Sequence, residues 1–315
     1  MRILLGPALL TVATSLAAQE LPPYVPSNPA LTSRSALYAQ PMVRPSKGWQ
    51  LRTVADYANA VEVTVAPSGR TYNFDAETLS GDIWLTHDLS PRLFVVGNVA
   101  IRGGYAGFMD GFLNWYHDFV GLKVPARNRR TENRFTWEYD LPDGQHLVYE
   151  RPGTFIGDAR VGAGLRFGKS QLVAAVTLPT AGAEGWGRDV IGTALQLTSR
   201  WVDNSRFVVE AGAAAGWTPT HGSQAAFQRA TFLGAQLASR WRFSGRQALF
   251  ATLWMQSPNW KNTGFNALDN AEVTLDFGGL VKFGKHWPEL QIGMTEDLMP
   301  AGPAVDAGFK LGVRW

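Results

Sequence analysis

The stretch VDAGFKLGVRW, residues 305–315, ends the chain and alternates between apolar residues and polar or small ones. Side chains of a β-strand point to opposite faces in turn, so this segment would have one oily face and one charged face. The apolar face ends on Trp315, and the other face carries Lys310 and Arg314. The pattern predicts a strand that separates an apolar medium from a wet one.

The same alternation recurs upstream, for example at 157–167, 205–217, 229–243 and 271–283. These segments are long for a soluble sandwich, where strands of about 5–6 residues are commonest. They match the about 9–11 residues that a tilted membrane-spanning strand needs. The links between them alternate between short turns and long loops. An outer-membrane barrel shows this asymmetry between its two rims.

We therefore predict an all-β fold, an antiparallel up-and-down transmembrane β-barrel over residues 49–315, with both chain ends at the short-turn, periplasmic rim. The candidate strands number about 14, or about 12 if the hairpin at 134–152 lies outside the wall in a long outer loop. The shortness of 145–151 favours 12. A closed sheet leaves no strand edge unpaired in lipid. An aromatic girdle is expected beside the short turns, formed by Trp49, Phe167, Trp201, Phe207, Phe243, Phe283, Trp287 and Trp315.

The N-terminus has the features of a secretory signal over residues 1–18. Arg2 precedes an apolar run, and small residues including Ala17 and Ala18 mark the cleavage region. The mature protein is expected in the cell outer membrane. Residues 19–48 follow as a strap in the periplasm or in the lumen, because this segment is too proline-rich to pair as a strand.

Composition argues against several classes of protein. Cysteine is absent, so stability must come from packing or from a closed hydrogen-bond network. Charged residues make up 17% of the chain and the tight basic cluster is RNRR at 127–130, so no nucleic-acid binding is expected. The five histidines are isolated in the sequence, and we expect no metal site and no cofactor.

The segment GFMDGFLNWYHDFVGL, residues 107–122, departs from the alternation. Aromatic residues repeat at helical spacing at Phe108, Phe112, Tyr116 and Phe119. Asp110, Asn114 and His117 fall on another face. We predict a short amphipathic helix that ends at Gly121 and packs into the barrel mouth or lies in the membrane interface. Its polar face is either a gate that contacts a solute or a solvated stripe, and the spacing favours the stripe.

The chain resembles an uncharacterised bacterial outer-membrane family, domain of unknown function 3187, in four stretches: SNPALTSRSALYAQPM (27–42), GFMDGFLNWYHDFVGL (107–122), RNRRTENRF (127–135) and FIGDARVGAGLRF (155–167). The matching positions are Asp110, His117, Gly121, Arg134 and Asp158. Membership implies an outer-membrane barrel with no assigned activity. The tripeptide Asn28-Pro29-Ala30 is also similar to a motif of the long-chain fatty-acid transporters, and that resemblance implies a lumen-plugging role for the strap at 21–41.

The polar face of the strands carries nearly equal numbers of bases and acids. The bases are Arg52, Arg102, Arg160, Arg166, Arg200, Arg240, Arg242, Lys282, Lys310 and Arg314. The acids are Asp56, Asp82, Asp88, Asp158, Glu210, Glu272, Asp276 and Asp306. This balance favours a network of ion pairs that fills the lumen. The alternative is a charged constriction that selects solutes, with Arg240 and Arg242 beside Arg200 as an anion-attracting patch.

These patterns favour a passive channel or transporter for a small solute, with no catalytic residues assigned. One alternative is a lipid-modifying enzyme similar to outer-membrane phospholipases, because His221 and Ser223 pair a base with a hydroxyl. Nucleophilic catalysis also needs a third group to hold the base, and THGSQAAF offers none. Another alternative is a sealed structural or surface-binding barrel. The expected partners are outer-membrane lipids, the small solute, and the barrel-assembly machinery through the strand ending in Trp315.

Overall fold

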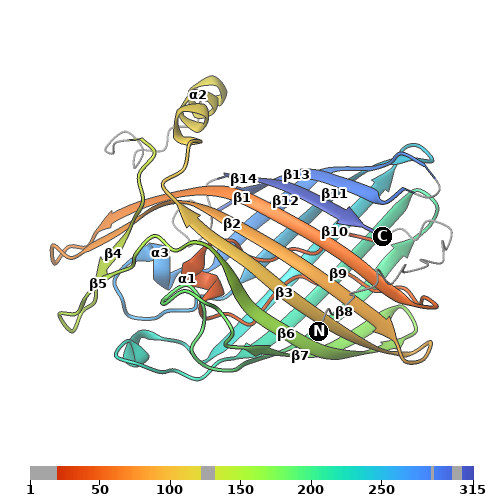
Figure 1. Ribbon diagram of the computed structural model, residues 1–315, viewed down its shortest axis with the longest axis horizontal. Coiled ribbons are helices and arrows are strands. Elements are labelled where there is room, and N and C mark those ends of the chain that lie inside the picture. Colours follow the sequence, from red (N-terminus) through yellow and green to blue (C-terminus); the bar gives the residue numbers. More distant parts are fainter. Residues whose placement is uncertain (1–19, 122–131, 285–286, 300–306) are drawn as a thin grey trace, which may run out of the picture.

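The computed structural model describes residues 20–121, 132–284, 287–299 and 307–315 (Figure 1). The predicted signal peptide at 1–18, the RNRR cluster at 127–130 and Asp306 lie outside the described residues. The strands are β1 (Trp49–Val65), β2 (Thr71–Asp88), β3 (Leu93–Tyr105), β4 (Thr136–Asp140), β5 (His146–Val148), β6 (Gly153–Phe167), β7 (Ser170–Leu178), β8 (Gly192–Asp203), β9 (Phe207–Trp217), β10 (Thr231–Arg242), β11 (Gln247–Gln256), β12 (Glu272–Lys282), β13 (Glu289–Asp297) and β14 (Ala307–Arg314).

The sheet closes on itself because β1 pairs antiparallel with β2 on one side and with β14 on the other. The ring runs β1, β2, β3, β6 and then in sequence order to β14, which makes a barrel of 12 strands. β4 pairs with β2 beyond the ring, and β5 pairs with β4. The prediction of a 12-stranded wall with the 134–152 hairpin outside it is confirmed.

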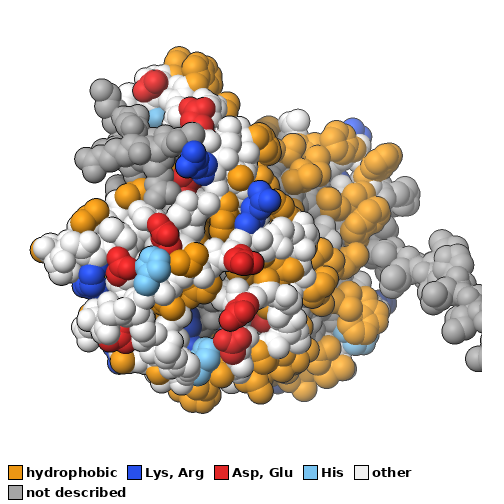
Figure 2. Space-filling model, turned by 60° about the vertical axis from the view of Figure 1, so that its left-hand side comes forward, with side chains coloured by type: hydrophobic (Ala, Val, Ile, Leu, Met, Phe, Trp, Pro, Cys, Tyr) orange, Lys and Arg blue, Asp and Glu red, His pale blue; other side chains and the backbone are white. Residues whose placement is uncertain are grey.

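The burial pattern is that of a membrane barrel. In β8, Leu195 and Leu197 are 48% and 43% exposed, whereas the alternate residues Gln196 and Thr198 are 3% and 0% exposed. Apolar side chains thus point outward and polar ones inward, the reverse of a soluble core. The eight aromatic residues of the predicted girdle are between 44% and 65% exposed. Figure 2 shows hydrophobic side chains gathered on the barrel wall.

The two rims differ as the sequence predicts. Short links such as 168–169 and 204–206 lie at one rim, together with Trp49 and Trp315; we call it the short-turn rim. The opposite, long-loop rim is at the left of Figure 1. Within the described residues, no helix combines the length and the apolar character needed to cross a membrane.

The long-loop rim carries a cap that the sequence did not reveal. β1 and β2 remain paired up to Val65 and Thr71. They form a hairpin that overhangs the lumen, and β4 pairs with its β2 side at Tyr72–Asp75. Ring side chains of this overhang and of nearby loops share one buried cluster, the aromatic cap, formed by Tyr72, Phe74, Trp137, Tyr139, Trp186, Trp260 and Phe265. The short helix α3 (Asn266–Asp269) adds Ala267 and Leu268 to the same cluster.

The aromatic segment forms α2 (Asp110–Val120), which ends at Gly121 with a left-handed φ of 75°, as predicted. Figure 1 shows it projecting sideways from the barrel near the long-loop rim. Leu113 is buried against Ala307 of β14, and the Phe112 ring lies 6.0 Å from that of Phe309. The helix therefore sits on the outside of the wall and not in the barrel mouth, the first of the two placements that the sequence suggested.

Candidate functional site

The lumen is occupied by residues 20–48, which we call the plug hairpin. Its two legs pair at Tyr24 and Ala39 through two backbone hydrogen bonds of 3.0 and 2.8 Å. The tip is the single helical turn α1 (Pro29–Thr32), started by the Asn28 side chain, which accepts from Ala30 N at 2.8 Å. The chain thus rises from the short-turn rim to the aromatic cap and returns before β1 begins.

The base of the plug hairpin is tied to the wall by Glu20. Its Oε2 lies 2.5 Å from Arg52 Nη2 and 3.1 Å from Arg314 Nη1, and its backbone carbonyl accepts from Arg240 at 2.9 Å. Burial acts to raise the pKa of the Glu20 carboxyl, but the guanidinium groups of Arg314 and Arg52 outweigh it and hold that pKa below its usual range. Glu20 therefore stays ionised at neutral pH and anchors the plug by charge.

The middle of the first leg sits on a buried charge cluster. Lys310 Nζ lies 2.5 Å from Asp276 and 3.5 Å from Asp56, and also 5.2 Å from the centre of the Tyr24 ring. The Tyr24 hydroxyl donates to Glu272 Oε1 at 2.8 Å. Three strands of the wall and one residue of the plug thus share a single polar network.

The tip is bound mainly through backbone carbonyls and amide groups. Arg34 donates to the carbonyl oxygens of Thr218, Pro219 and Arg229 at 3.0 to 3.2 Å, and Trp260 Nε1 donates to Ala30 O at 3.1 Å. Burial lowers the pKa of Arg34 to about 10, which leaves it protonated at neutral pH. The outer loops and the aromatic cap therefore close over the tip.

Among the described residues, small cavities of about 30 and 10 Å³ lie between the plug hairpin and the wall. A buried water needs roughly 10–15 Å³, so these cavities have the size of one or two water molecules. A larger groove of about 720 Å³ lies on the outer face of β6–β9, where Leu195 and Trp217 help to line it. That groove is outside the barrel, on the side opposite to the plug hairpin.

The arginines predicted from the strand pattern do point into the lumen, and most of them are neutralised. Arg200 binds Glu210 at 2.5 Å, and Arg240 holds both carboxylate oxygens of Glu289 at 3.2 and 2.7 Å. Arg242 is half-buried beside them and its backbone N–H donates to Arg206 O. Facing carboxylates thus compensate the charges of Arg200 and Arg240, which argues against an anion-attracting patch formed by these two with Arg242.

Arg166 and Arg160 contact the returning leg of the plug hairpin. Arg166 donates to the carbonyl of Val43 at 2.6 Å and forms an ion pair of 2.7 Å with Asp88. Arg160 donates to Thr177 at 3.1 Å, and its guanidinium lies 4.0 Å above the ring of Tyr38. Both side chains position the returning leg of the plug against the wall.

The polar face of α2 does not reach the lumen. Asp110 accepts from Asn59 Nδ2 at 2.9 Å and from the backbone of Asn133 at 2.6 Å, and Asn114 donates to Glu132 at 2.9 Å. His117 is buried, with its ring centre 5.7 Å from that of Tyr116. These residues hold the segment after the helix against the outer wall, away from the lumen that the gating alternative required.

In the candidate hydrolase pair, His221 contacts residues other than Ser223. Ring nitrogens of His221 lie 3.1 Å from Arg34 Nη1 and 3.1 Å from Asp189 Oδ2, and neither contact is to Ser223. The structure thus uses His221 to support the tip of the plug hairpin.

Sequence reasoning missed Glu20, Arg34 and Arg188, three charged residues that bind the plug. Arg188 donates to the carbonyls of Thr32 and Ser35, so it joins a long loop to the tip. The strap and the loop have no periodicity, so alternation cannot assign their side chains to a face. A buried position for Arg34 had one signal in the sequence, its place within the otherwise uncharged, proline-rich segment 21–41.

Among solved structures, the barrel is similar to the COG4313 outer membrane channel from Pseudomonas putida F1, with 17% identity, a TM-score of 0.50, and coverage of 87% of this chain and 98% of that chain. Weaker likenesses are to the CymD monoaromatic hydrocarbon channel (9% identity, TM-score 0.41, 86% and 88% covered) and the P. putida toluene transporter TodX (10%, 0.39, 86% and 89%). At 17% identity, the first likeness shows the fold alone. Among curated proteins, none is a significant match to this sequence.

One family model does match, over residues 26–315, and its description is "Protein of unknown function (DUF3187)". The match takes in the plug hairpin after its base, the whole wall and α2, the regions that carry the sequence resemblance. The chain belongs to the DUF3187 family of outer-membrane-type β-barrels.

Proposed function

We propose that this protein is an outer-membrane channel whose plug hairpin closes the lumen at rest and must shift for a small solute to pass. One observation carries the proposal: the lumen is filled by a separate N-terminal segment, and the wall leaves room for it. Gly216 and Gly234 of the wall lie where an added Cβ would meet Leu37 at 2.9 and 3.2 Å. The wall is thus shaped around the plug hairpin.

The membrane placement rests on the outward side chains. Exposed leucines and an aromatic girdle are unfavourable in water and favourable in lipid. The closed wall satisfies its own backbone hydrogen bonds, so it does not need water as a partner. The short-turn rim with both ends of the barrel faces the periplasm in this proposal. The aromatic cap then faces outward, and a solute from outside would meet the cap before the plug.

The packed lumen also favours a second candidate, a permanently sealed barrel with a structural or surface-binding role. Ion pairs such as Arg240–Glu289 and Lys310–Asp276 are buried, and breaking a buried pair is costly. The two candidates differ in one respect, namely whether the plug hairpin leaves the lumen while the wall stays folded.

A disulfide lock separates them, because the chain has no cysteine of its own. The Cβ of Ala36 in the plug lies 3.1 Å from where a Cβ on Gly192 of β8 would stand, close to the about 3.5–4.5 Å between Cβ atoms in disulfides. Ala36→Cys with Gly192→Cys would tie the plug to the wall. A matched control, Ala58→Cys with Gly308→Cys, joins two wall strands at 3.0 Å and leaves the plug free.

Planar-bilayer conductance is the readout. We expect the wild type, the reduced lock and the oxidised control to show openings, and the oxidised lock to be silent until a reductant is added. Openings that persist in the oxidised lock would show that passage does not need the plug to move. Silence of all four, including the wild type, would establish the sealed barrel.

A further inference from the structure

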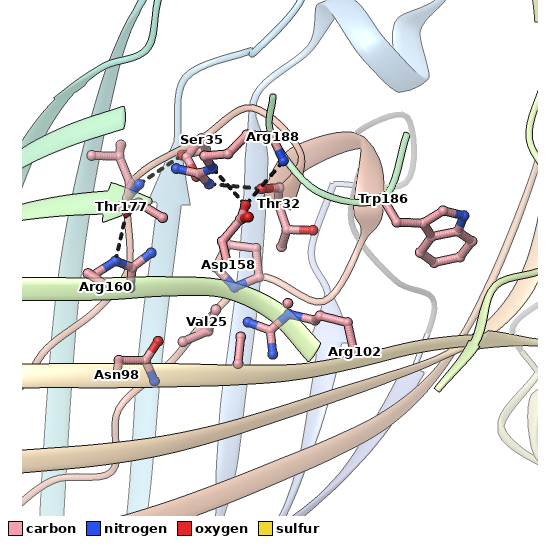
Figure 3. Close-up of a pocket in the computed structure, with 14 residues that line it drawn as sticks. Val25, Thr32, Ser35, Asn98, Arg102, Asp158, Arg160, Thr177, Trp186 and Arg188 are labelled. Carbon is pink, nitrogen blue, oxygen red and sulfur yellow. Dashed lines mark hydrogen bonds and ion pairs between the residues drawn. The ribbon is translucent and has the colours of Figure 1, made fainter. Parts of the chain in front are cut away.

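The larger of the two lumen cavities lies between the plug hairpin and the wall near the long-loop rim (Figure 3). Three arginines from separate elements line it: Arg102 of β3, Arg160 of β6, and Arg188 of the loop between β7 and β8. Pro26 and Ser35 of the plug form its other side. The cavity is therefore a joint between plug and wall.

Two of these arginines have carboxylate partners. Arg102 Nη1 lies 3.0 Å from Asp82, which also accepts from Asn98, and Arg188 Nε lies 3.1 Å from Asp158. Asp158 accepts in addition from the backbone N–H groups of Thr180 and Ala181. Both carboxylates are thus already committed to partners around the cavity.

Arg160 is the exception. Its polar contact is the Thr177 hydroxyl, and its flat faces lie against Tyr38 and Trp84, so it forms no ion pair with any residue the structure describes. The cluster therefore holds one positive charge more than its two carboxylates balance. An unbalanced buried charge is costly, and a bound ion of opposite sign removes that cost.

Donors also remain unused at the cavity. Arg160 Nη1 and Arg188 Nη1 are fully buried and have no hydrogen-bond partner among the described residues. The two side chains are 7% and 4% exposed and both line the cavity. Burial lowers the pKa of Arg188 to about 10, so its charge persists at neutral pH.

The volume of the cavity limits the size of the ligand that it can hold. About 30 Å³ accommodates roughly two water-sized particles. A halide ion fits that space, whereas a tetrahedral oxyanion or a carboxylate on a carbon skeleton brings more atoms than it holds. We infer that this cavity binds one small monovalent anion, of the size of chloride, beside Arg160 and Arg188. Binding there does not depend on whether the barrel conducts.

The first test compares thermal unfolding of the intact barrel in detergent in sodium chloride and in sodium gluconate at the same ionic strength. A ligand that binds the folded state raises Tm in a saturable way, so we expect Tm to rise as chloride replaces gluconate. Arg160→Gln should remove this dependence, and Arg92→Gln, at an exposed turn, should keep it. Equal Tm values in the two salts for the wild type, or a chloride dependence that survives in Arg160→Gln, would overturn the inference.

The second test needs no variant, which matters if Arg160→Gln fails to fold. Crystals of the wild-type barrel soaked in sodium bromide should show an anomalous peak in the cavity, within hydrogen-bond distance of Arg160 and Arg188. A peak there establishes the site, and a cavity without bromide in well-soaked crystals refutes it.

Discussion

Glu20 of the plug hairpin and Arg314 of β14 form an ion pair of 3.1 Å across 294 positions of the chain. Because β14 is the strand that closes the barrel against β1, this contact joins the base of the plug to the seam of the wall. Plug docking and barrel closure are therefore coupled at the short-turn rim, and perturbing Glu20 should affect both.

Replacing Glu20 by Gln should destabilise the folded barrel. The change removes the buried charge that Arg52 and Arg314 share, and we expect a loss of about 2–4 kcal/mol in the free energy of unfolding. Arg44→Gln is the matched control, since its ion pair of 2.6 Å with Asp203 is about one-third exposed and should cost about 1 kcal/mol or less. Urea unfolding followed by tryptophan fluorescence measures both, and equal losses would argue against Glu20 as an anchor.

The ion pairs of Glu20 should also make the stability of the folded barrel depend on pH. The folded-state pKa of Glu20 lies below its usual range. Its contribution to stability is therefore fully present above the ordinary Glu pKa of about 4.3, and is lost as pH falls through the lower folded value. The urea midpoint of the wild type should fall in that interval, and that of Glu20→Gln should fall less. Parallel curves for the two proteins would exclude Glu20 as a source of the acid sensitivity.

We propose that α2 lies in the outer interface of the membrane. Phe108, Trp115 and Phe119 are 74%, 59% and 78% exposed next to the outward face of β14, an arrangement that suits an interfacial helix. A nitroxide at position 119 in vesicle-bound protein should be more accessible to oxygen, which concentrates in lipid. One at Asn114 should be more accessible to a water-soluble nickel complex. The reverse order would place the helix in water.

We also propose that Trp315 serves in assembly by the barrel-assembly machinery. It is 55% exposed, and its backbone donates to Leu51 at 3.1 Å across the seam. Trp315→Ser keeps this backbone bond, so the equilibrium stability should change by about 1 kcal/mol or less, while the appearance of folded barrel in cells should slow several-fold. Heat-modifiable migration on gels follows the folding in time. An unchanged assembly rate would remove Trp315 from that role.

The wall could be predicted from the sequence because each of its strands repeats one local rule. Leu195 and Gln196 point to opposite faces, as the pleat of a strand requires. Every strand of the wall has lipid on one face and polar groups on the other, so the same alternation recurs in each. The sequence also identified the lumen arginines correctly as a set. It did not identify their carboxylate partners. Arg240 binds Glu289, which lies 49 positions further along the chain, and that contact depends on strand register and tilt.

The positions of elements without a periodic pattern could not be predicted from the sequence. The proline-rich strap has the same composition whether it lies in the periplasm or in the lumen, and its place is set by contacts such as Arg34 with Thr218 in a distant loop. The sequence predicts the aromatic and polar faces of α2. It does not predict whether the helix lies inside or outside the wall. In water the residues around Phe112 would be a core face, and beside lipid they are the exposed face, so spacing alone cannot distinguish the two.

The most direct measurement is the formation of the Ala36→Cys/Gly192→Cys disulfide itself in folded, membrane-inserted protein. With the plug hairpin in the lumen, mild oxidation should link the two thiols in nearly every molecule. Ala36→Cys paired with Leu195→Cys, an outward position on the same strand, should stay reduced. Free labelling of the thiol at position 36 by a bulky water-soluble reagent, with no link to position 192, would contradict a lumen filled by residues 20–48.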